Sequence, residues 1–198
     1  CRLLVVETRE SGFEVVDTDL GERIVQLAGE PPSHIIVPAI HHTREEVGAL
    51  FERRMDGPRG ETDPERLMAH ARRDLRARFL AAQAGVSGVN FALAETGSIE
   101  LVTNEGNADL GTAQPPLHIA CVGIEKVLPG LDDLPVFLRL LARSATGQPI
   151  SAYTSVLTGP RAGGELHVVL VDNGRSRLLA SEAHRRALRS VSSASTTA

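Results

Sequence analysis

The segment VNFALAETGSIELVT, residues 89–103, decides the fold because it predicts an antiparallel hairpin. Two apolar runs, Val89–Ala94 and Ser98–Thr103, read as strands bounded by turn residues. Only the three residues Glu95–Gly97 separate them, which is too short for the crossover that joins parallel strands. The sheet that contains this pair must therefore include antiparallel strands.

Strand-like and helix-like patterns alternate along the rest of the chain. Several of the strand-like runs are apolar on both faces, as expected when helices cover a sheet on both sides. Further strands are expected at Phe13–Thr18, His34–Ile40, Leu117–Ile124, Ile150–Leu157 and Leu166–Val171. Helices are expected over Glu22–Ala28, from the capping box at Thr43 through Phe51, over Pro64–Ala84 after the N-cap Asp63, from Asp132 or Asp133 through Leu141, and from Ser181.

This alternation predicts an α/β fold with a mixed, mainly parallel sheet and helices on both faces. The length of 198 residues fits one domain, which we expect over residues 1–189. The Ser/Thr-rich segment SVSSASTTA, residues 190–198, reads as a disordered tail.

Composition excludes several classes of function. A net charge of -4, an aromatic content of 3% and the absence of Trp argue against nucleic-acid binding, which needs clustered basic charge or stacking platforms. Two cysteines, Cys1 and Cys121, are too few for a disulfide scaffold, an iron–sulfur cluster or a structural zinc site, so a reducing cytoplasm is expected. No apolar run approaches the roughly 20 residues that span a bilayer.

A candidate binding site follows from the positions of polar residues after the strands. Glu105 lies just past its strand, and ligands of open α/β sheets bind outside the carboxyl ends of parallel strands. The strand from Gly97 to Glu105 spans about 26 Å, so Glu95 and Glu105 lie at its opposite ends and cannot act as an acid/base pair. We expect Glu105 to be catalytic and a small anionic or hydroxylated ligand to be bound by Asn104, Gly106, Asn107, Glu125, Lys126, Asp172, Asn173 and Arg175.

Plainer interpretations of the same residues stay open. The NEGN and DNG segments are turn sequences in which Asn and Gly tolerate positive φ, and Glu125–Lys126 is equally consistent with a surface ion pair. His41 and His42, with Glu45 nearby, invite a metal interpretation. Adjacent histidines on a helix point about 100° apart, however, so no metal site is expected.

Five segments resemble a known family: DTDLGERIVQLAGEPPSHIIVPAIHHTREEV, GVSGVNFALAETGSIELVTNEGN, HIACVGIEKVLP, RSATGQPISAYTSVLTGPR and ELHVVLVDNGRSRLLA. Together they are similar to the lactate utilization (LUD) domain, in its lactate utilization protein B branch, from about Gly12 to Arg189. The resemblance implies a cytoplasmic bacterial protein that works with two companion proteins in the iron–sulfur-dependent oxidation of L-lactate to pyruvate. It also implies a fold like that of ribose-phosphate isomerase, glucosamine-phosphate deaminase and the CoA-transferases.

The chain departs from this family at both ends. Fuller members carry about ninety more N-terminal residues and, after the last helix, a ferredoxin-type run of cysteines. Ser190, Ser193 and Thr196 stand where cysteines would be expected, and hydroxyls do not replace thiolates as iron ligands. Iron–sulfur clusters are therefore expected only on partner chains or fuller members, with no cofactor in this chain.

Three functions follow from the sequence. The first is a LUD-domain subunit that binds and assembles other lactate utilization proteins. The second is a free-standing isomerase- or CoA-transferase-like enzyme in which Glu105 is the base or nucleophile and Lys126 or Arg175 holds an anionic substrate. The third is a non-catalytic sensor of a small anion.

Overall fold

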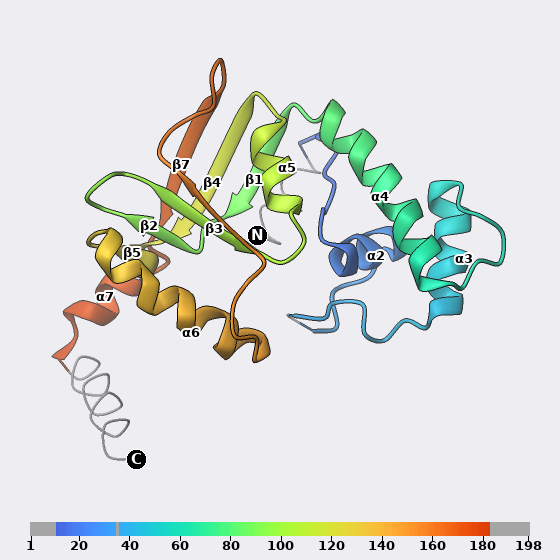
Figure 1. The fold of residues 1–198 in the computed structure, drawn as a ribbon, viewed down its shortest axis with the longest axis horizontal. Coiled ribbons are helices and arrows are strands. Elements are labelled where there is room, and N and C mark those ends of the chain that lie inside the picture. Colours follow the sequence, from blue (N-terminus) through green and yellow to red (C-terminus); the bar gives the residue numbers. More distant parts are fainter. Residues whose placement is uncertain (1–10, 35, 183–198) are drawn as a thin grey trace, which may run out of the picture.

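The strands form two sheets in the computed structural model, which describes residues 11–34 and 36–182. Sheet A is parallel, with the order β1-β4-β7, and sheet B is mixed, with the order β5-β2-β3-β6 (Figure 1). The strands are β1 (Ala84–Gly88), β2 (Phe91–Leu93), β3 (Ile99–Thr103), β4 (Leu117–Gly123), β5 (Val127–Leu128), β6 (Tyr153–Leu157) and β7 (Glu165–Val171). The predicted α/β class, with parallel and antiparallel strands, is confirmed.

The predicted hairpin is the antiparallel pair β2–β3, in which Phe91 lies opposite Glu100. The chain changes sheets just before it. The backbone N–H of Val89 donates to Cys121 in sheet A at 2.8 Å, and the N–H of Asn90 donates to Glu100 in sheet B at 2.9 Å. The apolar run Val89–Ala94 therefore contributes to both sheets. Its pattern does not show the change from one sheet to the other, so the sequence predicts a single sheet.

Apolar side chains hold the two sheets together. Strand β4 alternates between buried and half-buried residues, as expected for a strand with one face in the core. Its buried face packs against β3 in a cluster formed by Val89, Ile99, Leu101, Ala120 and Val122. This cluster fixes how the hairpin lies on the parallel sheet.

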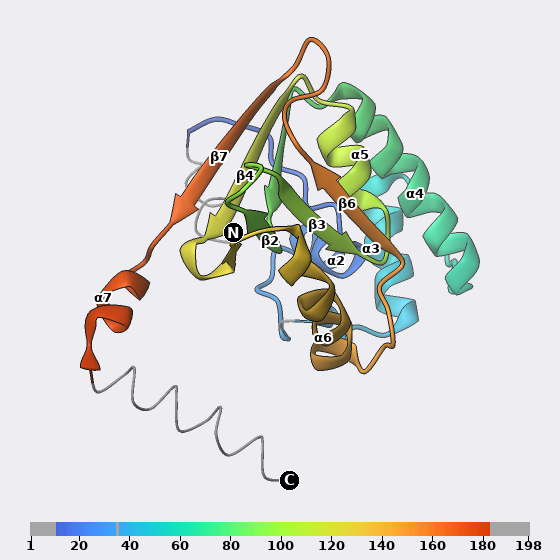
Figure 2. The same ribbon diagram turned by 60° about the vertical axis from the view of Figure 1, so that its left-hand side comes forward.

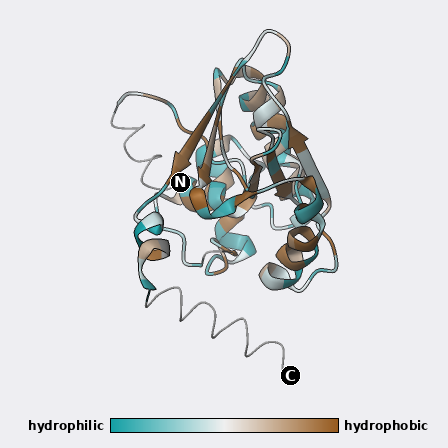
Figure 3. Cartoon of the chain, turned by 90° about the vertical axis from the view of Figure 1, so that its left-hand side faces the viewer, coloured by the Kyte–Doolittle hydropathy of each residue, from teal (hydrophilic) through white to brown (hydrophobic). Residues whose placement is uncertain are grey.

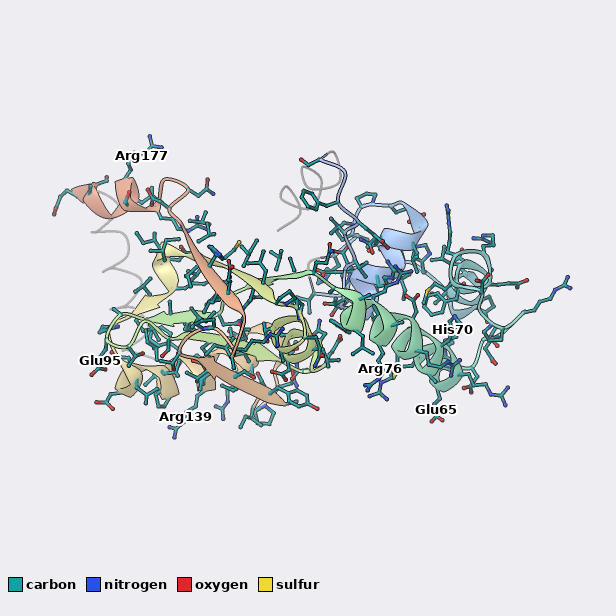
Figure 4. All side chains as sticks on the ribbon, turned by 90° about the horizontal axis from the view of Figure 1, so that it is seen from above. Glu65, His70, Arg76, Glu95, Arg139 and Arg177 are labelled. Atoms are coloured by element: carbon teal, nitrogen blue, oxygen red, sulfur yellow. The ribbon has the colours of Figure 1, made fainter. Side chains whose placement is uncertain are left out.

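Three helices form a separate layer beside the sheets (Figures 1 and 2). They are α2 (Leu20–Ala28), α3 (Arg44–Met55) and α4 (Pro64–Ala81), packed around Ile24, Leu50, Phe51, Leu67 and Ala71. Both predicted caps are confirmed: Asp63 accepts from the N–H of Arg66, and Thr43 and Glu46 form a capping box. In Figure 4, Glu65 and Arg76 extend from α4 into solvent, while His70 lies towards α3, where it meets the carbonyl of Met55 at 3.0 Å.

The remaining helices border the sheets: α5 (Asn107–Ala113), α6 (Leu134–Thr146) and α7 (Arg175–Ala180), with short 3-10 turns at Ile124–Lys126 and Leu131–Asp133. Helix α6 covers sheet B through Leu134 and Leu138, and the rings of Phe91 and Phe137 lie 5.4 Å apart. No helix in the described part of the chain is both long and apolar enough to cross a membrane.

Two predicted strands are wrong. Phe13–Thr18 is not a strand: the side chain of Gln26 takes hydrogen bonds of its backbone, accepting from the N–H of Asp17 and donating to the carbonyl of Val15. In the region of His34–Ile40, a side chain again replaces hydrogen bonds to a neighbouring strand. His34 Nδ1 accepts from the N–H groups of Ile36 and Val37. These two short apolar runs are therefore loops and not strands. The predicted tail at 190–198, and the predicted helix from Ser181 beyond residue 182, lie outside the described residues.

Candidate functional site

Glu105 lies at the turn from β3 to α5, against the beginning of α2. Gly106 adopts a φ of 69°, which a residue with a side chain rarely takes, and this turn starts α5 directly after the strand. The Glu105 carboxyl lies close enough to Asp19 for the negative charge of that carboxylate to act on it. Residues 86 positions apart in the chain therefore form a carboxyl pair at a helix N-terminus.

This pair has the electrostatics of an acid/base site. Burial, and next the negative charge of Asp19, raise the pKa of Glu105. Asp19 is meanwhile held as an acceptor, because its Oδ1 receives the N–H groups of Gly21 at 2.8 Å and Glu22 at 3.2 Å. A carboxyl whose pKa is raised in this way is suited to exchange a proton with a bound ligand. The sequence reasoning missed Asp19, although an Asp before a helical pattern is an N-cap signal.

The neighbours of Glu105 in the sequence mainly hold the turn. The Asn104 side chain accepts from the N–H of Ala152 at 3.1 Å and donates to Gln148 at 3.1 Å. Asn107 Oδ1 accepts from Thr103 Oγ1 at 3.1 Å. These contacts support the turn interpretation of Asn104, Gly106 and Asn107, because their polar groups already have partners within the protein.

The other predicted site residues gather at the carboxyl end of sheet A. Glu125 Oε2 lies 2.8 Å from Arg175 Nε, which joins the loop after β4 to the start of α7. Asp172 accepts from both the N–H and the hydroxyl of Ser176 at 2.7 Å, and these hydrogen bonds lower its pKa. Asn173 takes a positive φ of 46°, as its turn interpretation requires. Lys126 Nζ donates to the carbonyl of Val89 at 3.2 Å.

The structure therefore divides the expected site residues into two groups. Sheet A ends at Gly88, Gly123 and Val171, where Glu125 and Arg175 meet. Strand β3 begins near this end, because its Glu100 pairs with Asn90, and then runs away from it. Helix α5 continues to the amino end of β1, where Gly111 lies against Gly85. A single site containing Glu105, Lys126 and Asn173 is therefore wrong, because the hairpin reverses the direction of β3.

Glu100, in the middle of β3, is a buried carboxyl that sequence reasoning left unnoticed. Its exposed fraction is 0%, and neither carboxyl oxygen has a hydrogen-bond partner among the described residues. Burial raises its pKa to about 7. The available signal was a charged residue at the centre of the apolar run IELV. No ligand-facing role follows from this position, but the cost of ionising Glu100 makes the fold sensitive to pH.

His41 and His42 do not lie on a helix, so the argument from helical geometry does not apply to them. Both precede α3, and their ring centroids lie 4.2 Å apart. Their Nε2 atoms face Glu30 rather than Glu45, at 2.9 Å and 3.3 Å from the same carboxylate oxygen. The sequence could not show this contact, because it depends on how the loop between α2 and α3 turns back.

An apolar surface remains open on strand β7. Its four residues, defined here as the β7 surface, are Val168, Val169, Leu170 and Val171, each between 41% and 60% exposed. Val169 and Val171 lie on one face of sheet A, and Val168 and Leu170 on the other. Figure 3 shows β7 in the hydrophobic colour. Parallel strands are normally covered on both faces, so the β7 surface has the character of a contact site.

The described residues do not fit an iron–sulfur cluster. Such clusters are held by several thiolates, usually four. Cys121, on β4, is the one cysteine within the described ranges, and it is free and half-buried. Cys121 cannot form a cluster site with these residues alone.

Comparison with known proteins identifies the family. The model for the LUD domain matches residues 3–178. Lactate utilization protein B of Geobacillus sp. (strain WCH70) is 48% identical over 179 residues, covering 87% of this chain and 38% of the relative. The uncharacterized electron transport protein YkgF of Escherichia coli (strain K12) is 46% identical over 180 residues, covering 88% of this chain and 38% of the relative.

Among solved structures, a DUF162 family protein from Deinococcus radiodurans shows 22% identity and a TM-score of 0.37, covering 48% of this chain and 57% of that one. The chain spans about two-fifths of the length of the curated relatives named above, 38% in each case. The family match covers most of the chain and agrees with the lactate utilization B relatives. The chain therefore belongs to the LUD domain family.

Proposed function

We propose that this LUD domain is a cytoplasmic binding and assembly module of a system that oxidises L-lactate to pyruvate. The relatives named lactate utilization protein B support a role in lactate utilization. The β7 surface carries the assembly part of the proposal, because four consecutive apolar residues of this edge strand of a parallel sheet are exposed. Its partners in this proposal are the companion lactate utilization proteins.

Electron transfer is assigned to other chains or segments. The described part of this chain offers one cysteine, Cys121, and iron–sulfur ligation requires several thiolates. The companion proteins or the additional length of fuller relatives would supply the clusters. The LUD domain would hold these components next to each other.

Replacing Val169 with Arg tests this assignment. Val169 is 44% exposed on β7, so the substitution places a charge on the surface without opening a core cavity. We expect the variant to elute separately from the companion proteins in size-exclusion chromatography, whereas the parent chain co-elutes. A buried charge without a partner should weaken association by about 2 kcal/mol or more.

Val136→Arg is the matched control. Val136 is 59% exposed, but it lies on α6 over sheet B. This variant should co-elute with the companion proteins as the parent does. Equal binding by the parent and both variants would contradict docking through β7.

A second function is favoured by one observation, the carboxyl pair of Glu105 and Asp19. The raised pKa of Glu105 suits this residue to proton transfer in an isomerase- or CoA-transferase-like reaction. The cations first assigned to the substrate, however, contact protein groups: Lys126 donates to Val89, and Arg175 pairs with Glu125. The carboxyl pair therefore lacks the anion-binding partners expected for it, and this function ranks second.

Glu105→Gln tests the enzymatic alternative. If Glu105 transfers a proton, turnover of a phosphosugar or CoA thioester should fall by about 100-fold or more, with little change in melting temperature. Glu95→Gln, at an exposed position of the β2–β3 turn (Figure 4), should leave turnover unchanged. If the parent shows neither turnover nor a ligand-dependent rise in melting temperature, the enzymatic alternative is excluded.

A further inference from the structure

Two histidines and one glutamate converge in the loop that joins α2 to α3. Glu30 follows the helix cap Gly29, and its N–H donates to the carbonyl of Val25 at 3.0 Å. His42 is held from the other side, because its N–H donates to the carbonyl of Ala39 at 3.0 Å. Backbone hydrogen bonds thus set both ends of this loop and bring the three side chains together.

The hydrogen bonds of Ser33 determine the protonation of the His41 ring. The Ser33 hydroxyl donates to the carbonyl of Pro38 at 2.9 Å, so its oxygen must accept from His41 Nδ1, 2.8 Å away. Nδ1 of His41 therefore carries a proton, and in the neutral form of the ring Nε2 presents a lone pair. That lone pair faces an oxygen of the Glu30 carboxylate at 2.9 Å. Two electron pairs at this distance repel each other unless a positive charge lies between them.

His42 presents the same situation. Its Nε2 is buried without a hydrogen-bond partner among the described residues, although it lies 3.3 Å from Glu30 Oε2. Its Nδ1 lies 3.9 Å from Glu46 Oε2, which is too long for a hydrogen bond. The carboxylate oxygen is therefore faced by two imidazole nitrogens, one of which is unsatisfied.

The distances match those of a metal site. In tetrahedral zinc coordination, with bonds of about 2.0–2.1 Å, neighbouring ligand atoms lie about 3.3 Å apart. The two histidine nitrogens lie 2.9 Å and 3.3 Å from the glutamate oxygen, and all three atoms lie within 4.8 Å of one another. We propose that Glu30, His41 and His42 bind one divalent transition-metal ion of the zinc class.

This ligand set leaves a coordination position open. Glu30 and His42 line a cavity of about 290 Å³ with Glu46, Arg53 and Arg54. Water or a small anion can reach the fourth position from this cavity, as in sites with two histidines and one carboxylate. Ser33 supports the site from behind, because its hydrogen bond orients the His41 ring.

Isothermal titration of the tag-free chain with Zn²⁺, after treatment with a chelator, tests the proposal. One equivalent should bind, and Co²⁺ in its place should give the visible absorption of a tetrahedral site. His42→Ala and Glu30→Gln should each weaken Zn²⁺ binding by at least about tenfold. His41→Ala, at a side chain that is 36% exposed, gives a third variant in which folding is not at risk.

His167→Ala is the matched control. His167 Nε2 also lies close to a carboxylate, at 3.1 Å from Glu165, but it has no second histidine beside it among the described residues. Zn²⁺ binding should be unchanged in this variant. A parent chain that binds no Zn²⁺, or variants at Glu30, His41 and His42 that bind it as the parent does, would overturn the site and leave protonated imidazoles as the source of positive charge.

Discussion

Glu100→Gln is expected to raise the free energy of unfolding at about pH 8 by roughly 3 kcal/mol relative to the parent chain. Glu100 is fully buried without a hydrogen-bond partner among the described residues, and burial raises its pKa from 4.5 to about 7. At pH values between these two pKa values, Glu100 holds a proton in the folded chain and releases it in the unfolded chain. Stability contributed by the protonated form is therefore lost as the pH rises through this range.

Urea unfolding at two pH values measures this effect. At about pH 4 the carboxyl is protonated in both states, so the variant and the parent should have similar free energies of unfolding. Their difference should then grow up to about pH 8. Glu95→Gln, at an exposed position, is the control and should show no such growth. Parallel stability curves for Glu100→Gln and the parent would mean that Glu100 ionises in the folded protein without cost.

Gly85→Ala is expected to destabilise the fold by about 3 kcal/mol or more. A Cβ at Gly85 on β1 would overlap the carbonyl oxygen of Gly111 on α5. Because the Cβ position is fixed by the backbone of β1 and the oxygen belongs to the backbone of α5, a side-chain rotation cannot relieve the overlap. The displaced α5 would also carry the β3–α5 turn, so the contact between Glu105 and Asp19 should weaken with it.

Gly111→Ala tests the other side of this contact. A Cβ there would meet only Phe79, at an ordinary distance of 3.9 Å. Ala is the better helix former, so thermal unfolding should show a change between neutral and a stabilisation of about 1 kcal/mol. Equal effects of the two substitutions would contradict the close packing of α5 on β1.

The elements that could be predicted from the sequence are those set by local chemistry. The three-residue turn at Glu95–Gly97 allows only a hairpin, and Asp63 and Thr43 mark helix starts by their hydrogen bonds. The two wrong strands had suitable apolar residues, but Gln26 and His34 supply the hydrogen bonds from side chains. Such partners depend on tertiary contacts that hydrophobic periodicity does not contain.

The candidate site was predictable only where parallel strands alone determine position. Glu125 and Arg175 follow neighbouring parallel strands, and they meet at 2.8 Å. Glu105 follows an antiparallel strand, so it lies elsewhere, beside Asp19. The hairpin that makes the sheet mixed is also the reason that the structure does not bring all of the expected site residues together.

Labelling of Cys121 tests the proposed assembly role most directly. Cys121 is half-buried on β4, where it pairs with Val169 of the β7 surface, so a partner docked there should cover its thiol. In a Cys1→Ser background, a water-soluble maleimide should modify Cys121 in the isolated chain. Adding the companion lactate utilization proteins should slow modification by about tenfold or more. An equal rate with and without them would contradict docking on β7.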